Sequence, residues 1–316
     1  MASELTIIIN ALFSVFLICG AGAFSHHLGW LDEAVEQKAM KLIINLFLPC
    51  FIITSLLNSE EFRDSSLIAT AFGSGFLIAI LGILTAYLVG RLTQFKKGSG
   101  LRTFALTTGV QNYGFLAIPL LMAVYPTQSE SIIGTAFIHG IGVEIAMWTI
   151  GLSTLSGSLK IEWKRIINAP SIAVLMSLII VHSELAPLIP DSLIQSASML
   201  GKCTFPVALL LIGATLYELR KNIEWTPKIL LTSILTRLLI LPAFYLVAGL
   251  LTPEASSLRL IFTIQIAMPA AMMPILIAKH HGGHPKTAAQ AVISTSLASI
   301  ITIPIWIIFA KKILLP

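Results

Sequence analysis

Runs of about 20 apolar residues recur along the whole chain, and each can cross a hydrocarbon core about 30 Å thick. Of the 316 residues, 56% are hydrophobic and only 11% are charged, whereas a soluble domain carries about 25% charged residues. So few charges cannot cover the surface of a water-soluble protein of this size. The sequence therefore predicts an all-α polytopic membrane protein and excludes a cytosolic enzyme, a disulfide scaffold and a disordered chain.

The apolar runs predict ten transmembrane helices joined by short connections, which leave no room for a soluble domain. An interfacial segment is expected between residues 184 and 196, around Pro187 and Pro190. The predicted spans are 5–24, 36–57, 67–90, 101–125, 130–153, 167–183, 197–217, 228–251, 257–280 and 287–310.

Lysine and arginine are unequally divided between the two predicted sides of the membrane. The net charge is +5, but the basic residues are scattered in short connections and form no stripe that would bind nucleic acid. One side holds 14 of them and the other holds five, which places both termini outside the cell and the basic connections in the cytoplasm. The larger set is Lys38, Lys41, Arg91, Lys96, Lys97, Arg102, Lys160, Lys164, Arg165, Arg220, Lys221, Lys228, Lys279 and Lys286.

Two halves of five helices each, at residues 1–153 and 167–316, are joined by a cytoplasmic linker at residues 154–166. An odd number of helices per half means that similar halves are inverted relative to each other, as in many secondary transporters. Spans four and nine both contain a helix breaker followed five residues later by proline. These pairs are Gly114 with Pro119 and Pro269 with Pro274, and spans two and seven also carry a proline each.

Interruptions of this kind survive in a membrane only where they are packed in protein or line a wet cavity. Broken helices 4 and 9 would cross near the midplane and present the partial positive charge of their half-helix N-termini to an anion. The polar run just before the first break, from Thr107 to Tyr113, is natural beside a hydrated site. The simpler alternative is that proline and glycine are merely frequent in membrane helices.

The order and spacing of these motifs resemble the auxin efflux carrier family, which includes the plant PIN carriers and bacterial organic-acid permeases. The segment Asn112-Tyr113-Gly114-Phe115-Leu116-Ala117-Ile118-Pro119 is similar to that family's first crossover. The segment Met268-Pro269-Ala270-Ala271-Met272-Met273-Pro274 resembles its second crossover. Phe47-Leu48-Pro49 resembles the proline-containing second helix that faces the substrate.

The resemblance implies a scaffold bundle beside a crossover bundle that moves like an elevator and carries an organic anion. The long central hydrophilic loop of many plant members is missing, and Ala270 stands where plant carriers tend to have a polar residue. A small carboxylate is therefore a better candidate substrate than auxin itself. The related sodium–bile acid symporters share the overall plan, so coupling of transport to sodium stays an alternative. The implied substrate-binding residues are Asn112, Tyr113, Gly114, Pro119, Phe51, Ile52, Gln265, Met268, Pro269 and Pro274.

Three ionisable residues within the spans are candidates for proton or ion coupling. Glu144 can carry a proton or pack as a hydrogen-bonded residue, and His139 can relay a proton or pack likewise. Arg237 can neutralise a substrate carboxylate, pair with Glu144 or extend toward an interface. Gln265, four residues before Pro269, can coordinate a cation or hold the broken backbone, and the second role is favoured.

The sequence contains no motif of a metalloprotease, a phosphate-binding loop or a serine hydrolase, so an enzyme is disfavoured. The stretch from His280 to His284 is interpreted as an ordinary turn, and no metal or cofactor is expected beyond a coupling Na⁺ or H⁺. The expected function is a secondary carrier for a small organic anion, and the alternatives are a sodium-coupled symporter or a membrane receptor. The expected partners are this anion and the lipid bilayer, and assembly as a homodimer is an open alternative. The expected location is a bacterial inner membrane, with both termini outside.

Overall fold

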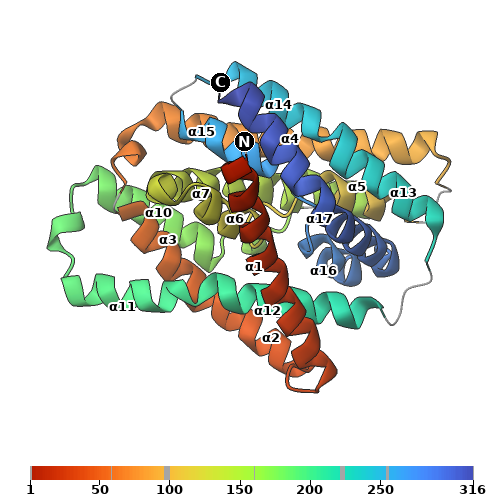
Figure 1. The fold of residues 1–316 in the computed structure, drawn as a ribbon, viewed down its shortest axis with the longest axis horizontal. Helices are drawn as coiled ribbons and strands as arrows, with labels where there is room; N and C mark the ends of the chain where they lie inside the picture. The colour runs from red at the N-terminus through yellow and green to blue at the C-terminus, as the bar shows by residue number, and fades with distance from the viewer. Residues whose placement is uncertain are drawn as a thin grey trace. The chain divides into compact units, whose positions relative to one another are not determined.

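The computed structural model describes residues 2–57, 59–95, 100–159, 161–220, 225–253 and 256–315. Within these ranges the chain is helical and contains no β-strand (Figure 1). Lys96, Lys97, Lys160 and Lys221, which contribute to the charge count, lie outside the described residues.

Seven helical segments of the described residues are long and apolar enough to cross a membrane. Together they make the chain an integral multi-pass membrane protein. The other three predicted spans are a 14-residue helix, α10 (Ala169–His182), and two interrupted segments. The seven segments are Leu5–His27, Glu33–Leu57, Ser65–Leu92, Ile132–Ser156, Asp191–Leu219, Pro227–Leu251 and Pro285–Leu314.

The two interrupted segments break where the proline and glycine pattern predicts. The first consists of α5 (Leu101–Gly109) and α6 (Ala117–Val124), separated by residues 110–116. The second consists of α15 (Ser257–Gln265) and α16 (Met273–His280), separated by residues 266–272. We call residues 110–116 the first break and residues 266–272 the second break.

The chain divides into two compact units, and each takes segments from both halves of the sequence. Unit 1 comprises residues 1–71, 118–138 and 164–221, and unit 2 comprises residues 72–117, 139–163 and 222–316.

Unit 1 is built on close helix pairs with small residues at their contacts. Helix α1 (Ala2–His27) packs against α12 (Thr204–Leu219), and the two helices cross in Figure 1. A β-carbon at Gly22 would overlap the carbonyl oxygen of Leu210, and one at Gly213 would overlap that of Cys19. Helix α3 (Leu48–Leu57) packs against α10 and α11 (Asp191–Lys202), and α2 (Glu33–Leu42) packs against α12.

The region from 184 to 196 differs from the predicted interfacial segment. A short 3₁₀ turn covers Ala186–Leu188, and α11 already begins at Asp191. Pro190 directly precedes α11. Proline has no backbone N–H, and at this position the helix needs no hydrogen-bond donor from it. The last six residues of the predicted interfacial segment, 191–196, are thus the first part of the apolar helical segment Asp191–Leu219.

Unit 2 is centred on α17 (Pro285–Leu314), which contacts α5, α15, α16 and α13 (Pro227–Leu235). Helix α4 (Ser65–Leu92) approaches α5 closely, since a β-carbon at Gly82 would overlap the carbonyl oxygen of Gly109. Unit 2 also contains α14 (Pro242–Leu251), α8 (Leu152–Ser156) and the π-helical turn Met147–Gly151 that precedes α8. Helix α7 (Ser129–Ala146) crosses from one unit into the other along the chain.

Two prolines inside long helices produce π-helical turns and not breaks. The π-helical turns Ile43–Phe47 and Thr236–Ile240 each end two residues before a proline, Pro49 and Pro242 respectively. Proline lacks an N–H and clashes with the preceding turn, and a widened turn relieves this clash without ending the helix. The predicted irregularity at Phe47-Leu48-Pro49 is therefore a local widening of a continuous helical segment.

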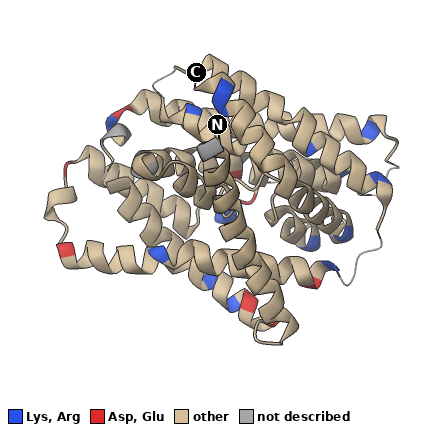
Figure 2. Ribbon diagram, viewed as in Figure 1, with Lys and Arg blue, Asp and Glu red and all other residues tan. Residues whose placement is uncertain are grey.

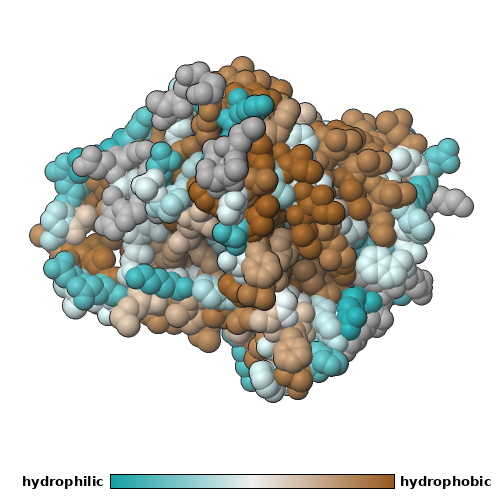
Figure 3. Space-filling model, in the orientation of Figure 1, coloured by the Kyte–Doolittle hydropathy of each residue, from teal (hydrophilic) through white to brown (hydrophobic). Residues whose placement is uncertain are grey.

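Charged residues lie mostly at or near helix ends (Figure 2). Brown, apolar residues gather over α13 and α17 in Figure 3, and Leu231 of α13 and Ile301 and Ile305 of α17 are each at least 60% exposed. Exposed side chains of this kind are expected where a helix faces hydrocarbon.

Candidate functional site

The two breaks pair with each other through their backbones inside unit 2. Gln111 and Ala270 form an isolated antiparallel bridge. The Asn112 N–H donates to the carbonyl of Pro269 at 2.8 Å, and the Ala271 N–H donates to that of Val110 at 2.9 Å. Backbone groups released by the breaks would be costly in hydrocarbon, and this pairing satisfies them. Each break is therefore the structural support of the other.

One side-chain hydrogen bond holds the backbone of each break. Gln265 Nε2 donates to the carbonyl oxygen of Tyr113 at 3.0 Å, so this glutamine holds the broken backbone. The Ala270 N–H donates to Thr295 Oγ1 of α17 at 3.2 Å. Sequence reasoning missed Thr295, because a hydroxyl within a membrane helix usually bonds its own preceding turn, as this one also does with Ala291.

The first break leaves polar groups open to a ligand. Asn112 is partly exposed, and its Oδ1 accepts only a long hydrogen bond, 3.4 Å, from the Leu116 N–H. Its amide nitrogen makes no hydrogen bond to any described residue. A β-carbon at Gly114 would meet no atom within 4 Å. Asn112 thus offers a free donor beside open space.

Next to the first break lies a buried polar core. Gln111 is fully buried and donates through Nε2 to the hydroxyl of Tyr245, which is also fully buried. Its Oε1, like that of Gln265, makes no hydrogen bond within the described residues. Buried polar atoms normally find partners, so these oxygens mark a place where a partner is expected. The role of Tyr245 was also missed by the sequence reasoning.

Arg237 lies in this core, only 1% exposed. Its Nη1 donates weakly, at 3.4 Å, to the carbonyl of Gly109 at the C-terminal end of α5. Nε and Nη2 have no hydrogen-bond partner, and no carboxylate of the described residues lies within 4.0 Å of the guanidinium. Among the described residues Arg237 therefore forms no ion pair with Glu144, and its buried side chain lies against Gly109 inside the bundle and not at an interface.

His139 and Glu144, on α7, occupy different surroundings. His139 is fully buried, with Nδ1 3.0 Å from Ser74 Oγ and its ring packed against Tyr245 and Phe262. Glu144 is partly exposed and interacts electrostatically with the hydroxyl of Tyr113. The structure thus connects both residues to the neighbourhood of the first break, and their roles in coupling remain predictions.

The remaining candidate residues are divided between the units. Met268 and Pro269 belong to the second break, and Pro274 lies buried in the first turn of α16. In unit 1, Pro119 lies in α6, Ile52 is fully buried, and Phe51 packs edge-on against Phe137 and Phe205. The proximity of Phe51 and Ile52 to a substrate remains a prediction.

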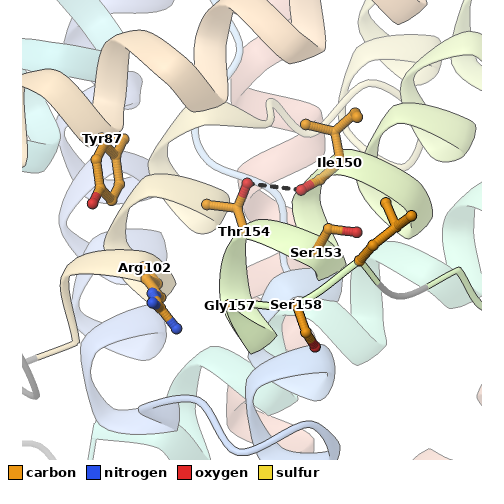
Figure 4. Close-up of a pocket in the computed structure, with 8 residues that line it drawn as sticks. Tyr87, Arg102, Ile150, Ser153, Thr154, Gly157 and Ser158 are labelled. Atoms are coloured by element: carbon orange, nitrogen blue, oxygen red, sulfur yellow. Dashed lines mark hydrogen bonds between the residues drawn. The ribbon is translucent and has the colours of Figure 1, made fainter.

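A pocket of about 450 Å³ in unit 2 lies away from the residues discussed above. It is a shallow hollow lined by Tyr87, Arg102, Ser153, Thr154 and their neighbours (Figure 4). The Thr154 hydroxyl bonds back to the carbonyl of Ile150 at 2.7 Å, as the dashed line in Figure 4 shows. Because no residue of either break lines this hollow, we do not assign it to the candidate site.

Comparison with known proteins identifies the family. The profile of the family described as "Membrane transport protein" matches the chain twice, over residues 7–160 and 153–307. No curated protein matches the chain in sequence. The family is one of transporters and not of enzymes, and the two matches together cover nearly the whole chain. The chain is a membrane transporter and belongs to this family, that of the auxin efflux carriers and PIN-like proteins, which its two crossover motifs resemble.

Proposed function

We propose that the chain is a secondary active carrier for a small organic anion, such as a carboxylate or an auxin-like acid. The observation that carries this proposal is the free amide nitrogen of Asn112, which stands beside open space at the first break. An amide donor is suited to a carboxylate oxygen, and the bond is strengthened by the charge of the acceptor.

The charge distribution of unit 2 supports an anionic substrate. The buried guanidinium of Arg237 has no carboxylate partner among the described residues. Helix α16 begins directly after the second break, so its N-terminus places a partial positive charge beside that break. A buried cation that lacks a countercharge is costly, and an anion bound nearby would lower that cost.

The proposal includes ten spans arranged as two inverted repeats, residues 1–153 and 167–316 joined by residues 154–166. Two observations support it. The family profile matches the chain as two stretches that meet near this linker. The two breaks occupy corresponding positions in the two halves, in the fourth and ninth predicted spans.

Transport by an elevator-like movement is supported by the division into two compact units, because each unit combines segments of both halves. In this proposal unit 2, which holds the paired breaks, carries the substrate, and unit 1 is the scaffold. The distribution of Lys and Arg supports both termini outside, and we place the protein in a bacterial inner membrane.

A ligand screen on purified protein tests the proposal. Small carboxylates, with and without sodium and at several pH values, should raise the apparent unfolding temperature, since a ligand at 100 times its Kd stabilises the folded state by about 2.7 kcal/mol. Each stabilising carboxylate should then show counterflow in proteoliposomes. Binding without counterflow would support a receptor instead, and stabilisation by neutral or cationic compounds alone would contradict the proposal.

A further inference from the structure

A cluster of metal-binding side chains lies in unit 1, among helix ends that the transport proposal does not use. His26 is in the last turn of α1, Glu36 is in the first turn of α2, and Glu218 is near the end of α12. One ligand atom from each of these residues lies within 4.8 Å of the others. Two consecutive helices, α1 and α2, and the distant helix α12 thus bring an imidazole and two carboxylates together.

The cluster is held in place by hydrogen bonds and ring contacts. His26 Nδ1 donates to Glu36 Oε1 at 2.9 Å, and the Thr215 hydroxyl donates to Glu36 Oε2 at 3.1 Å. The Tyr217 ring lies 5.7 Å from that of His26, and its hydroxyl is 2.7 Å from His27 Nδ1. Glu36 is only 8% exposed, so its carboxylate has little freedom to turn away. In metal sites of proteins, neighbouring residues commonly hold the metal ligands in place by such hydrogen bonds.

The charge of the cluster is unbalanced. Two carboxylates face one imidazole, and no Lys or Arg nitrogen of the described residues lies within 4.0 Å of either carboxylate. Arg220, the residue that directly follows α12, lies over the Tyr217 ring at 3.9 Å instead of pairing with Glu218. Two partly buried carboxylates repel each other, and a bound cation would remove that repulsion.

We propose that His26, Glu36 and Glu218 bind a divalent transition-metal ion, with Zn²⁺ as the best match. One nitrogen and two oxygen ligands fit zinc, which takes histidine and carboxylate ligands at about 2.0–2.2 Å in tetrahedral geometry. Ca²⁺ and Mg²⁺ prefer sites made of oxygen alone. Binding at Nδ1 replaces the proton that His26 shares with Glu36, and this proton passes to solvent.

The metal would join three helices of unit 1 at a single point. Helices α1 and α12 already pack closely against each other, whereas α2 packs less extensively on α12 and is linked to both helices here by the His26–Glu36–Thr215 contacts. On the predicted topology all three helix ends lie on the cytoplasmic side, so the ion would be drawn from the cytoplasm. The bound metal stabilises unit 1 and takes no part in recognition of the transported anion.

The test is Zn²⁺ titration of the full chain, purified without a histidine tag and treated with a chelator. Calorimetry should show one ion per chain, and the apparent unfolding temperature should rise. Glu36→Gln should abolish binding. Glu218→Gln, at a more accessible position, should weaken binding at least tenfold in a protein that folds normally. Thr215→Val should weaken it by about 10- to 100-fold, since it removes only the hydroxyl that holds Glu36.

The matched control is the other histidine-rich stretch, around His281 and His284, which contributes to no metal-binding group among the described residues. The double substitution H281Q/H284Q should leave the titration unchanged. The proposal would be overturned if wild-type protein bound no Zn²⁺. It would equally be overturned if binding survived in folded Glu218→Gln and Thr215→Val proteins, or if H281Q/H284Q removed it.

Discussion

The two breaks of unit 2 form one backbone pairing but differ in their surroundings. Residues 112–115 of the first break are partly exposed, and Asn112 and Tyr113 bring polar side chains. Residues 266–270 of the second break are all buried and have apolar side chains. The second break is therefore an anchor built into the bundle, whereas the first presents groups to a ligand. Equal interruption of two helices does not mean an equal role.

Asn112→Ala should produce the largest loss of affinity. Losing a hydrogen bond to a charged group costs about 1.5 to 3 kcal/mol, which corresponds to roughly a 10- to 150-fold weaker Kd. Calorimetric titration with the best carboxylate of the screen measures this change. Gln94→Ala is the control, since the Gln94 backbone, and not its side chain, bonds Lys228. Unchanged affinity in Asn112→Ala protein would remove Asn112 from the site.

Thr295→Val tests whether the second break is structural. Valine keeps the shape of threonine but leaves the buried Ala270 N–H without its acceptor, and such a loss costs about 1–3 kcal/mol of stability. We expect a lower unfolding temperature with an unchanged Kd for the substrate. A large loss of affinity at unchanged stability would reverse the roles assigned to the two breaks.

Gln265→Leu should have an intermediate effect on affinity. It removes the hydrogen bond to the Tyr113 carbonyl, which is worth about 0.5–1.5 kcal/mol, and so allows the first break to move. If that bond orders the binding conformation, the Kd should rise by about 2- to 10-fold. Gln195→Leu, at an exposed position of α11, makes the same chemical change as a control.

Gly114→Ala should change stability least, by no more than about 0.5 kcal/mol, because the added methyl group meets open space. Ala267→Val, in the fully buried second break, should cost about 1–3 kcal/mol through overpacking. Thermal or denaturant unfolding of the two variants in parallel measures the contrast. Equal destabilisation would mean that the first break is as tightly packed as the second.

The positions of the breaks were predictable from the sequence, and the contacts that stabilise them were not. Gly114, Pro119, Pro269 and Pro274 mark interruptions because proline removes a donor and glycine relaxes the backbone. Those are local properties. The pairing of Gln111 with Ala270 joins residues distant in sequence, and no local pattern specifies it.

The direction in which a side chain points is likewise not specified by a local sequence pattern, and this limited the prediction of the site. Arg237 stands alone in an apolar run, and from sequence it can reach an interface, a substrate or Glu144. The π-helical turn Thr236–Ile240 contains this residue and ends before Pro242, and it turns the side chain toward Gly109. Tyr245 and Thr295 look like ordinary helix residues in sequence, because hydroxyls in membrane helices have many uses.

The most direct test of the account compares one carboxylic acid that binds with its uncharged primary amide, both titrated into wild-type protein. The two compounds have nearly the same shape, so the ratio of their Kd values isolates the contribution of the negative charge. With Arg237 unpaired by any described carboxylate and Asn112 offering a free donor, the carboxylate should bind at least tenfold more tightly, about 1.4 kcal/mol. Equal binding of the amide, or tighter binding, would contradict the claim that this transporter recognises an organic anion.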